Sequence, residues 1–145
     1  MYPGWTDVSF LLCYCSDILR EFNPSLTGFS VGKGKEHTPQ AFLNQAVAGG
    51  KAKDIPEQVR ALVARMKNDS LVNFQEDWKV ITLFIGGNDM CDYCHSSLFY
   101  STENYVRHIR ESLDYLHKQV GAEGVSQFSL NLSLFHLLAF TDQIR

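Results

Sequence analysis

Near the middle of the chain, residues 78–89 read WKVITLFIGGND, and the clearest structural signal in the sequence lies here. The first eight of these residues, Trp78–Ile85, are mostly β-branched, aromatic or leucine, which is typical of a β-strand. Because their apolar character is nearly continuous, we expect both faces of the strand to be covered, as in a parallel sheet. The strand is predicted to stop at Gly86-Gly87-Asn88-Asp89, since these residue types commonly form turns.

A helix is predicted on each side of this strand. The first begins at Asp54, Pro56 and Glu57, with a carboxylate at the N-cap, a proline in the first turn and a glutamate three residues after the cap. Its apolar residues follow at helical spacing for about three turns. The second helix covers Thr102–Gln119, where the apolar residues form one stripe, and Gly121 ends it.

The other segments are less regular. From Asn23 onward the chain is polar and rich in glycine, which predicts a long loop. Ala41–Ala48 is short and apolar and closes on Gly49-Gly50, which predicts a buried strand running into a turn. Ser129–Leu134 alternates polar and apolar residues and suggests a strand, whereas Phe135–Phe140 fits a strand or a helix equally well.

The order of strand, glycine turn and helix occurs twice, which predicts an α/β sheet covered by helices. In such sheets the ligand site lies beyond the carboxyl ends of the strands. The turns at Gly49-Gly50 and Gly86–Asp89 both follow predicted strands. We therefore expect the functional residues in these two turns.

Composition narrows the classes of protein that the chain can belong to. Its 145 residues, 45% hydrophobic and 20% charged, suit one ordinary globular domain. A net charge of -3 argues against a nucleic-acid partner. No apolar run is close in length to a transmembrane helix, which needs about 20 residues. Only Asp7 precedes the apolar Val8–Cys15 as a charge, where a signal peptide carries Lys or Arg, so neither a signal peptide nor an anchor is expected.

Two short blocks resemble the GDSL or SGNH hydrolase family. Asn44–Gly49 resembles the second block of that family, an asparagine followed five residues later by a glycine, and Gly86–Asp89 resembles its third block, G-x-N-D. With Phe22–Ser30 and Cys91-Asp92-Tyr93-Cys94, they resemble the membrane-associated phospholipase B group. The resemblance covers about residues 18–120, as a partial hydrolase domain between divergent ends at 1–17 and 121–145.

The resemblance implies a fold and an activity. The fold is an α/β fold, here an incomplete three-layer α/β/α sandwich with a flavodoxin-like parallel sheet. The family activity is hydrolysis of acyl esters in phospholipids and lysophospholipids, with no cofactor and no metal. By resemblance, the Gly49 backbone N–H and the Asn88 side-chain amide form the oxyanion hole. The family is anchored at the cell surface or the apical membrane, or is secreted, and the compartment of this chain is left open.

The reactive groups of the family do not occur in this sequence. It has no Gly-Asp-Ser tripeptide for the nucleophile, and beyond the last predicted helix it has no final D-x-x-H block for the base. We therefore expect a fragment or splice form that is inactive as an esterase. Two alternatives stay open: an active hydrolase that uses Ser30 or a nucleophile from a partner, and a non-catalytic module that binds lipid or protein. A sheet without its first strand has an uncovered edge, which a protein partner can cover.

Three residues match catalytic patterns in letters only. Gly28–Gly32 spells G-x-S-x-G around Ser30, but the required strand before the serine and helix after it are not predicted. His95 completes a D-x-x-H that follows the third block immediately, so it is interpreted as a loop residue. His136 lies in an apolar run and is interpreted as a core histidine.

The four cysteines allow several interpretations. Cys91 and Cys94 form a C-x-x-C, for which a structural disulfide, as in a secreted homologue, is the leading interpretation. A zinc site shared with Cys13 and Cys15, or thiol–disulfide exchange, are the alternatives. No role is predicted for Cys13 and Cys15 by themselves.

Overall fold

The computed structural model describes residues 9–32, 34–120, 127–130 and 137–142, with side chains for residues 16–32 and 34–120. His136 lies outside the described residues, as do residues 1–8 and most of the C-terminal segment that was expected to diverge. In chain order the elements are α1 (Ser9–Phe22), η1 (Pro39–Ala41), η2 (Ala52–Asp54), α2 (Ile55–Asn68), β1 (Trp78–Leu83), α3 (Gly87–Tyr93), α4 (Thr102–Val120), β2 (Gln127–Leu130) and β3 (Leu137–Asp142).

β1 is the central strand of a three-stranded sheet with the order β2-β1-β3. It confirms the predicted strand, although it ends at Leu83, two residues early. β2 runs parallel to β1, with Gln127 opposite Val80, as expected. β3 runs antiparallel to β1, so the described sheet is mixed where a parallel sheet was expected. Residues 131–136 alone separate β2 from β3, fewer than the dozen or so that a parallel crossover needs.

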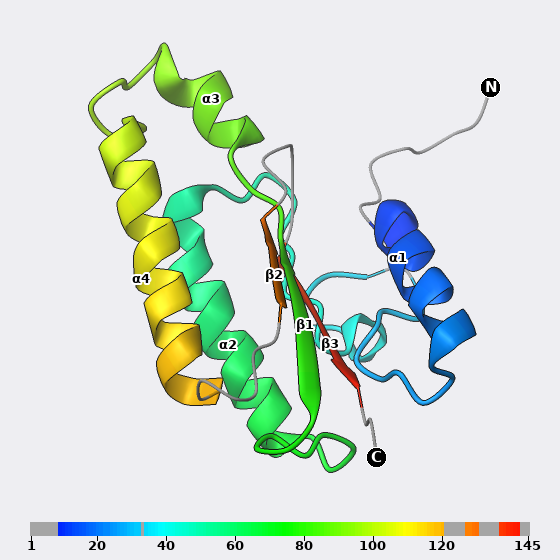
Figure 1. Ribbon diagram of the computed structural model, residues 1–145. Coiled ribbons are helices and arrows are strands. Elements are labelled where there is room, and N and C mark those ends of the chain that lie inside the picture. The colour runs from blue at the N-terminus through cyan, green and yellow to red at the C-terminus, as the bar shows by residue number, and fades with distance from the viewer. Residues whose placement is uncertain (1–8, 33, 121–126, 131–136, 143–145) are drawn as a thin grey trace, which may run out of the picture.

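Helices cover both faces of the sheet (Figure 1). α2 and α4 lie side by side on one face, and α1 lies on the other. The main core packs between α2, α4 and β1 and includes Ile55, Val59, Leu62, Val63, Met66, Ile81, Leu83, Ile109 and Leu116. A smaller cluster joins Leu19 of α1 to Leu26, Phe29 and Val80 on the opposite face. The predictions of two amphipathic helices and of a strand covered on both faces are therefore confirmed.

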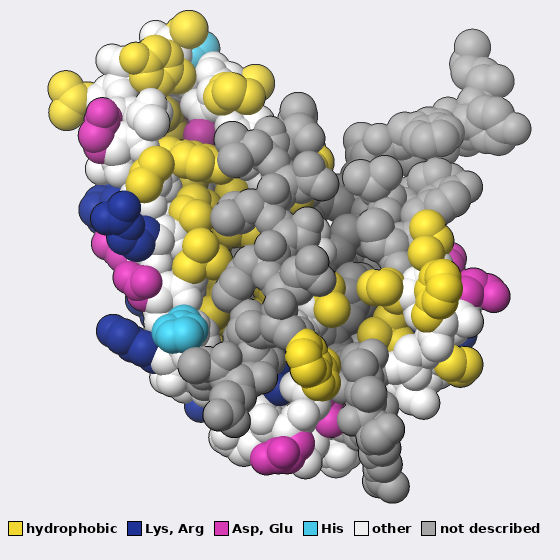
Figure 2. All heavy atoms as spheres, viewed as in Figure 1, with side chains coloured by type: hydrophobic (Ala, Val, Ile, Leu, Met, Phe, Trp, Pro, Cys, Tyr) yellow, Lys and Arg dark blue, Asp and Glu magenta, His cyan; other side chains and the backbone are white. Residues whose placement is uncertain are grey.

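The outward face of α4 is charged, as an amphipathic helix requires. Arg107 and Glu111 form an ion pair of 3.3 Å one turn apart. Figure 2 shows Lys, Arg, Asp and Glu side chains along the outer edge of this helix. Such an exposed pair adds only a few tenths of a kcal/mol, so it is the buried stripe of α4 that fixes the helix on the sheet.

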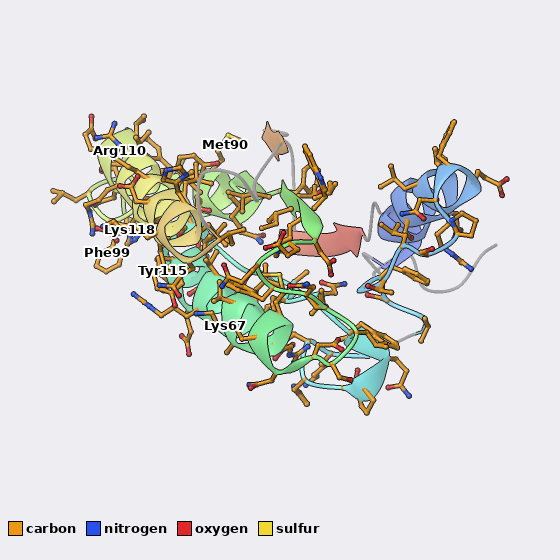
Figure 3. All side chains as sticks on the ribbon, turned by 60° about the horizontal axis from the view of Figure 1, so that its bottom comes forward. Lys67, Met90, Phe99, Arg110, Tyr115 and Lys118 are labelled. Carbon is orange, nitrogen blue, oxygen red and sulfur yellow. The ribbon has the colours of Figure 1, made fainter. Side chains whose placement is uncertain are left out.

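Polar contacts join α2 to α4 at their exposed sides. Lys67 Nζ donates to Gln119 Oε1 at 2.7 Å and lies 5.0 Å from the centre of the Phe74 ring. The Arg60 guanidinium lies 6.0 Å from the centre of the Tyr115 ring. Figure 3 shows Lys67 and Tyr115 projecting from the two neighbouring helices. These contacts keep the pair of helices in register beside the sheet.

The strand predicted over Ala41–Ala48 is wrong. Leu43 N–H donates to the Gly28 carbonyl at 3.1 Å, and Asn44 N–H turns back to the Ala41 carbonyl at 2.9 Å. The Asn44 side chain accepts from Ala46 N–H at 2.8 Å, and Phe42 has a positive φ of 49°. Local turns therefore use the backbone groups that a strand would offer to a sheet ladder.

Two helices were not predicted. The apolar run Val8–Cys15 predicts no particular element, whereas α1 runs from Ser9 to Phe22. Gly86–Asp89 was expected to be a turn, but Gly87 already begins α3. The N-terminus of α2 lies where it was predicted, but Asp54 caps the preceding η2 turn, because its carboxylate accepts from Lys51 N–H at 2.9 Å. Among the described residues, no helix is both long enough and apolar enough to cross a membrane.

Candidate active site

The two turns singled out in the sequence lie against each other. Asn88, in the first turn of α3, donates a hydrogen bond from Nδ2 to the Gly50 carbonyl at 2.9 Å. Gly50 N–H in turn donates to the Val47 carbonyl at 3.0 Å, which closes a tight turn over residues 47–50. The structure therefore brings the predicted site residues Gly49 and Asn88 to one place, although 39 positions separate them in the sequence.

Gly49 presents its backbone to the outside of this turn. Its φ of +77° is one that residues with a side chain rarely adopt, and an added Cβ would meet nothing within 4 Å. Its N–H donates to no acceptor among the described residues. Gly49 is therefore an exposed backbone donor in the turn that the Asn88 amide contacts through Gly50.

Asp89 anchors the chain that follows this turn. Its two carboxylate oxygens accept from Ala52 N–H at 3.1 and 3.0 Å. The side chain is buried, and this burial raises the pKa of the Asp89 carboxyl above its usual value, while the hydrogen bond from Ala52 opposes the shift. Asp89 therefore ties residues 49–52 to the start of α3.

Lys51 makes a second tie to α3. Its ammonium forms an ion pair with Asp92, donates to the Tyr100 hydroxyl oxygen at 3.1 Å and lies 4.9 Å from the centre of the Tyr100 ring. The hydrogen bond to Asp92 raises the pKa of Lys51, and the same bond lowers the pKa of Asp92. Sequence reasoning missed this cluster, because no local pattern links residues 41 and 49 positions apart.

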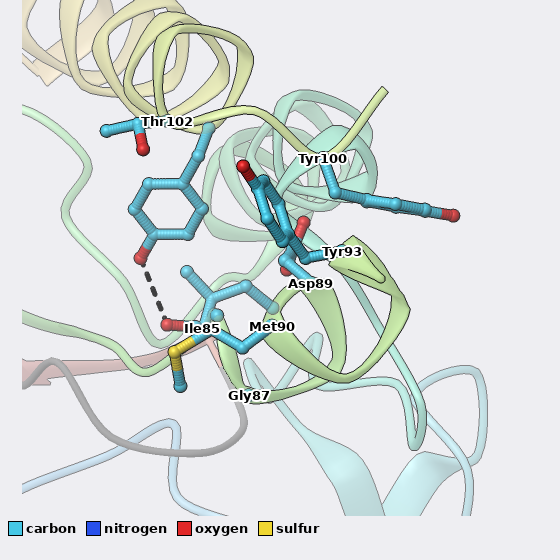
Figure 4. Close-up of a pocket in the computed structure, with 9 residues that line it drawn as sticks. Ile85, Gly87, Asp89, Met90, Tyr93, Tyr100 and Thr102 are labelled. Atoms are coloured by element: carbon cyan, nitrogen blue, oxygen red, sulfur yellow. Dashed lines mark hydrogen bonds between the residues drawn. The ribbon is translucent and has the colours of Figure 1, made fainter. Parts of the chain in front are cut away.

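A cavity of about 330 Å³ opens next to these contacts (Figure 4). Ile85, Gly87, Asp89, Met90 and Tyr93 are among the residues that line it. Asp89 is the one charged side chain among the described residues that line the cavity, so the cavity is mainly apolar. Because Gly87 and Asp89 flank Asn88, the cavity adjoins the turn that holds the amide.

Gly86 sets the direction of the chain between β1 and α3. Its φ is +123°, and a Cβ there would lie 3.2 Å from the Tyr105 ring. Tyr105 is held in place by the hydrogen bond from its hydroxyl to the Ile85 carbonyl at 3.0 Å. A glycine is therefore required where the chain turns from the strand into the helix that carries Asn88.

The other serine and histidine candidates lie elsewhere. Ser30 is in the loop between α1 and η1, with neither a strand before it nor a helix after it, as predicted. Its hydroxyl accepts from Asn44 Nδ2 at 3.0 Å and donates to the Ala41 carbonyl at 3.4 Å. His95 lies in the turn after α3, as its interpretation as a loop residue predicts.

Cys91 and Cys94 lie in and directly after α3, and both are exposed free thiols. The structure therefore does not contain the expected disulfide, which stays a prediction. The side chains of Cys13 and Cys15 lie outside the described part of the chain, so the alternative of a shared zinc site is untested. Over the described side chains, no group of three or more His, Cys, Asp and Glu residues could hold a metal ion.

Comparisons with known proteins give consistent matches. Residues 14–136 match the family model of GDSL-like lipases and acylhydrolases. The human protein named phospholipase B1, membrane-associated, is 63% identical over 105 residues, which cover 72% of this chain and 7% of that protein. The rat protein of the same name is 51% identical over 115 residues, covering 79% and 8%. The chain thus spans less than a tenth of the length of these relatives, and no solved structure is significantly similar to it.

Proposed function

Since the chain belongs to the GDSL-like lipase and acylhydrolase family, we propose that Gly49 and Asn88 are the oxyanion-binding donors of an ester hydrolase site. The contact between Asn88 and Gly50 supports this proposal most strongly, because it joins the Asn88 amide to the turn that contains Gly49. A side-chain amide has two N–H groups. One N–H of the Asn88 amide donates to the Gly50 carbonyl. The other N–H is the proposed donor to the oxyanion, together with the Gly49 N–H.

These donors suit the chemistry of acyl transfer. Attack on an ester carbonyl moves negative charge onto its oxygen, and donors fixed in advance stabilise that charge without reorganising. One such donor typically contributes about 3–4 kcal/mol to the transition state. The Gly50 carbonyl fixes the Asn88 amide, and Asp89 fixes the chain after Gly49, so both donors are held by contacts that do not use the substrate.

The proposed substrates are acyl esters of phospholipids and lysophospholipids. The relatives are named membrane-associated phospholipase B1, and the apolar cavity next to Asn88 can take part of an acyl chain. The finer fold is also a proposal: the described sheet is one part of a three-layer α/β/α sandwich with a flavodoxin-like parallel sheet. The domain boundaries after residues 17 and 120 stay predictions.

We propose that this stretch by itself does not hydrolyse esters. It contains no Gly-Asp-Ser tripeptide, and the contacts of Ser30 lead to Asn44 and Ala41 rather than to a histidine. Without a nucleophile and a base, oxyanion donors support only residual catalysis. The competing proposal, a module that binds lipid or protein without catalysis, gains support from the exposed apolar side chains near the cavity. Thiol–disulfide exchange has less support, since Cys91 and Cys94 lie at the C-terminal end of α3, and a helix N-terminus is what activates a thiol.

The proposal of inactivity is tested with nitrophenyl butyrate and a serine-reactive fluorophosphonate. We expect no turnover above that of the heat-treated chain and no covalent adduct, because no activated serine is predicted. Ser30→Ala serves as the control variant and should behave like the parent chain. Turnover that disappears in both Ser30→Ala and Asn88→Ala would instead identify Ser30 as a nucleophile working with the Asn88 donor.

A further inference from the structure

Four exposed apolar side chains gather at one end of the molecule. Met90, Tyr93, Leu98 and Phe99 are 70%, 49%, 88% and 67% exposed, and all lie in α3 or between α3 and α4. Figure 2 shows a group of hydrophobic side chains at this upper end, where Figure 1 places α3 and the loop leading to α4. We call these four residues the apolar rim. Apolar side chains gathered in this way mark an interaction surface more often than single exposed ones do.

The rim is electrically neutral. Residues 93–101 read YCHSSLFYS and contain no Lys, Arg, Asp or Glu. The adjacent carboxylate, Asp92, is paired with the Lys51 ammonium. Tyrosine, phenylalanine and leucine beside serine are residue types that settle at a boundary between hydrocarbon and water. A neutral lipid surface therefore fits the rim better than a charged macromolecule does.

The backbone of the rim is already hydrogen-bonded. Asn104 Nδ2 donates to the carbonyls of Leu98 and Phe99, at 2.9 and 3.4 Å. Phe99 N–H donates to the Ser96 carbonyl at 3.1 Å. Because unsatisfied backbone groups are what oppose entry into a lipid environment, this turn can place the Leu98 and Phe99 side chains in a lipid surface while their carbonyls stay hydrogen-bonded.

The rim is continuous with the candidate active site. Met90 and Tyr93 belong to the rim and also line the cavity (Figure 4). Gly87 and Asp89, the chain neighbours of Asn88, line the same cavity. A lipid that meets the rim therefore lies beside a cavity whose lining residues Gly87 and Asp89 are the chain neighbours of Asn88.

We propose that the apolar rim inserts into the surface of a neutral phospholipid aggregate and so brings acyl esters to the cavity beside Asn88. This proposal rests on the proposed function, since it assumes that the site handles acyl lipids. Leu98 and Phe99 make the main contacts with the lipid, because they are adjacent in the chain, are 88% and 67% exposed, and have backbone carbonyls that already accept hydrogen bonds from Asn104. Met90 and Tyr93 connect the rim to the cavity, which both of them line.

The test is co-sedimentation of the chain with dioleoylphosphatidylcholine vesicles. We expect the parent chain to bind, and Leu98→Ser/Phe99→Ser to lower its partition onto the vesicles at least tenfold. Phe22→Ser/Leu71→Ser is the matched control, since Phe22 and Leu71 are 85% and 58% exposed but lie in α1 and in the turn after α2. This control variant should stay within about twofold of the parent. Circular dichroism establishes that all three chains are folded.

Several results would overturn the proposal. If the folded parent chain does not bind the vesicles, the rim does not contact lipid. The same conclusion follows if the two double variants bind the vesicles equally well. A dimer in sedimentation velocity that is lost in the rim variant, without vesicle binding, would make the rim an interface between copies of this chain. The vesicle assay does not depend on the oxyanion donors. The chain can therefore fail to bind vesicles while a soluble anion still binds at Gly49 and Asn88. It can equally bind vesicles while no anion binds at these residues.

Discussion

Asp89→Ala is expected to lower the free energy of unfolding by about 2–3 kcal/mol, since it removes a charged hydrogen-bond acceptor and leaves a buried donor unsatisfied. Both carboxylate oxygens of Asp89 accept from Ala52 N–H. The same change frees residues 49–52 from α3. Urea unfolding checks this prediction, with Asp114→Ala on the exposed side of α4 as the control. Equal losses in the two variants would contradict the role given to Asp89.

The variant Asp89→Asn tests how the contribution of Asp89 to stability depends on pH. Burial raises the pKa of Asp89 in the folded state, so the folded chain keeps this proton to a higher pH than the unfolded chain does. The contribution of this group to stability therefore falls as the pH rises from the ordinary carboxyl range toward the raised pKa. Asp89→Asn retains an acceptor for Ala52 but cannot ionise. Its stability relative to the parent should thus improve between pH 4 and pH 7, and a difference that does not change with pH would contradict this explanation.

Gly86→Val is expected to cost about 2–4 kcal/mol. A φ of +123° strains a β-branched residue by about 1–3 kcal/mol. The added side chain also clashes with the Tyr105 ring. This clash weakens the hydrogen bond from the Tyr105 hydroxyl to the Ile85 carbonyl, which contributes about 1 kcal/mol. Both effects act where the chain turns from β1 into α3.

Gly49→Ala is the matched control for this prediction. Gly49 also has a positive φ, but open space surrounds the position of its Cβ. Only backbone strain of about 1–2 kcal/mol is then expected, and the N–H is retained. Thermal unfolding of the two variants compares them directly. If Gly86→Val were no more destabilising than Gly49→Ala, the contact with Tyr105 would not constrain the turn.

Periodicity predicted the elements that form the main core. The apolar runs of β1, α2 and α4 are long, and their buried residues match the expected faces. Shorter segments were mispredicted for local reasons. Ala41–Ala48 looks like a strand by hydrophobicity, but the Asn44 side chain and the positive φ of Phe42 make it a series of turns. The direction of β3 depends on chain connection and not on its own residue pattern.

The candidate site was predicted only in part. Gly49 and Asn88 were found through short blocks that resemble a family, and the structure places them together. The contacts that hold them were not found, because Asp89 reaches Ala52 and Lys51 reaches Asp92 across 37 and 41 positions. Such pairs depend on how the elements pack, which a single sequence does not specify. The apolar rim was likewise hidden, since exposure cannot be seen in a list of hydrophobic residues.

The central claim is that Gly49 and Asn88 form one anion-binding site. NMR titration with butylphosphonate, a stable anion whose oxygens resemble the charged oxygen of an acyl intermediate, tests it most directly. We predict saturable shifts of the Gly49 backbone and Asn88 side-chain N–H signals, lost in Asn88→Ala and kept in the control Asn68→Ala on the exposed end of α2. Signals that stay unmoved in the folded chain, or shifts that persist in Asn88→Ala, would contradict the claim.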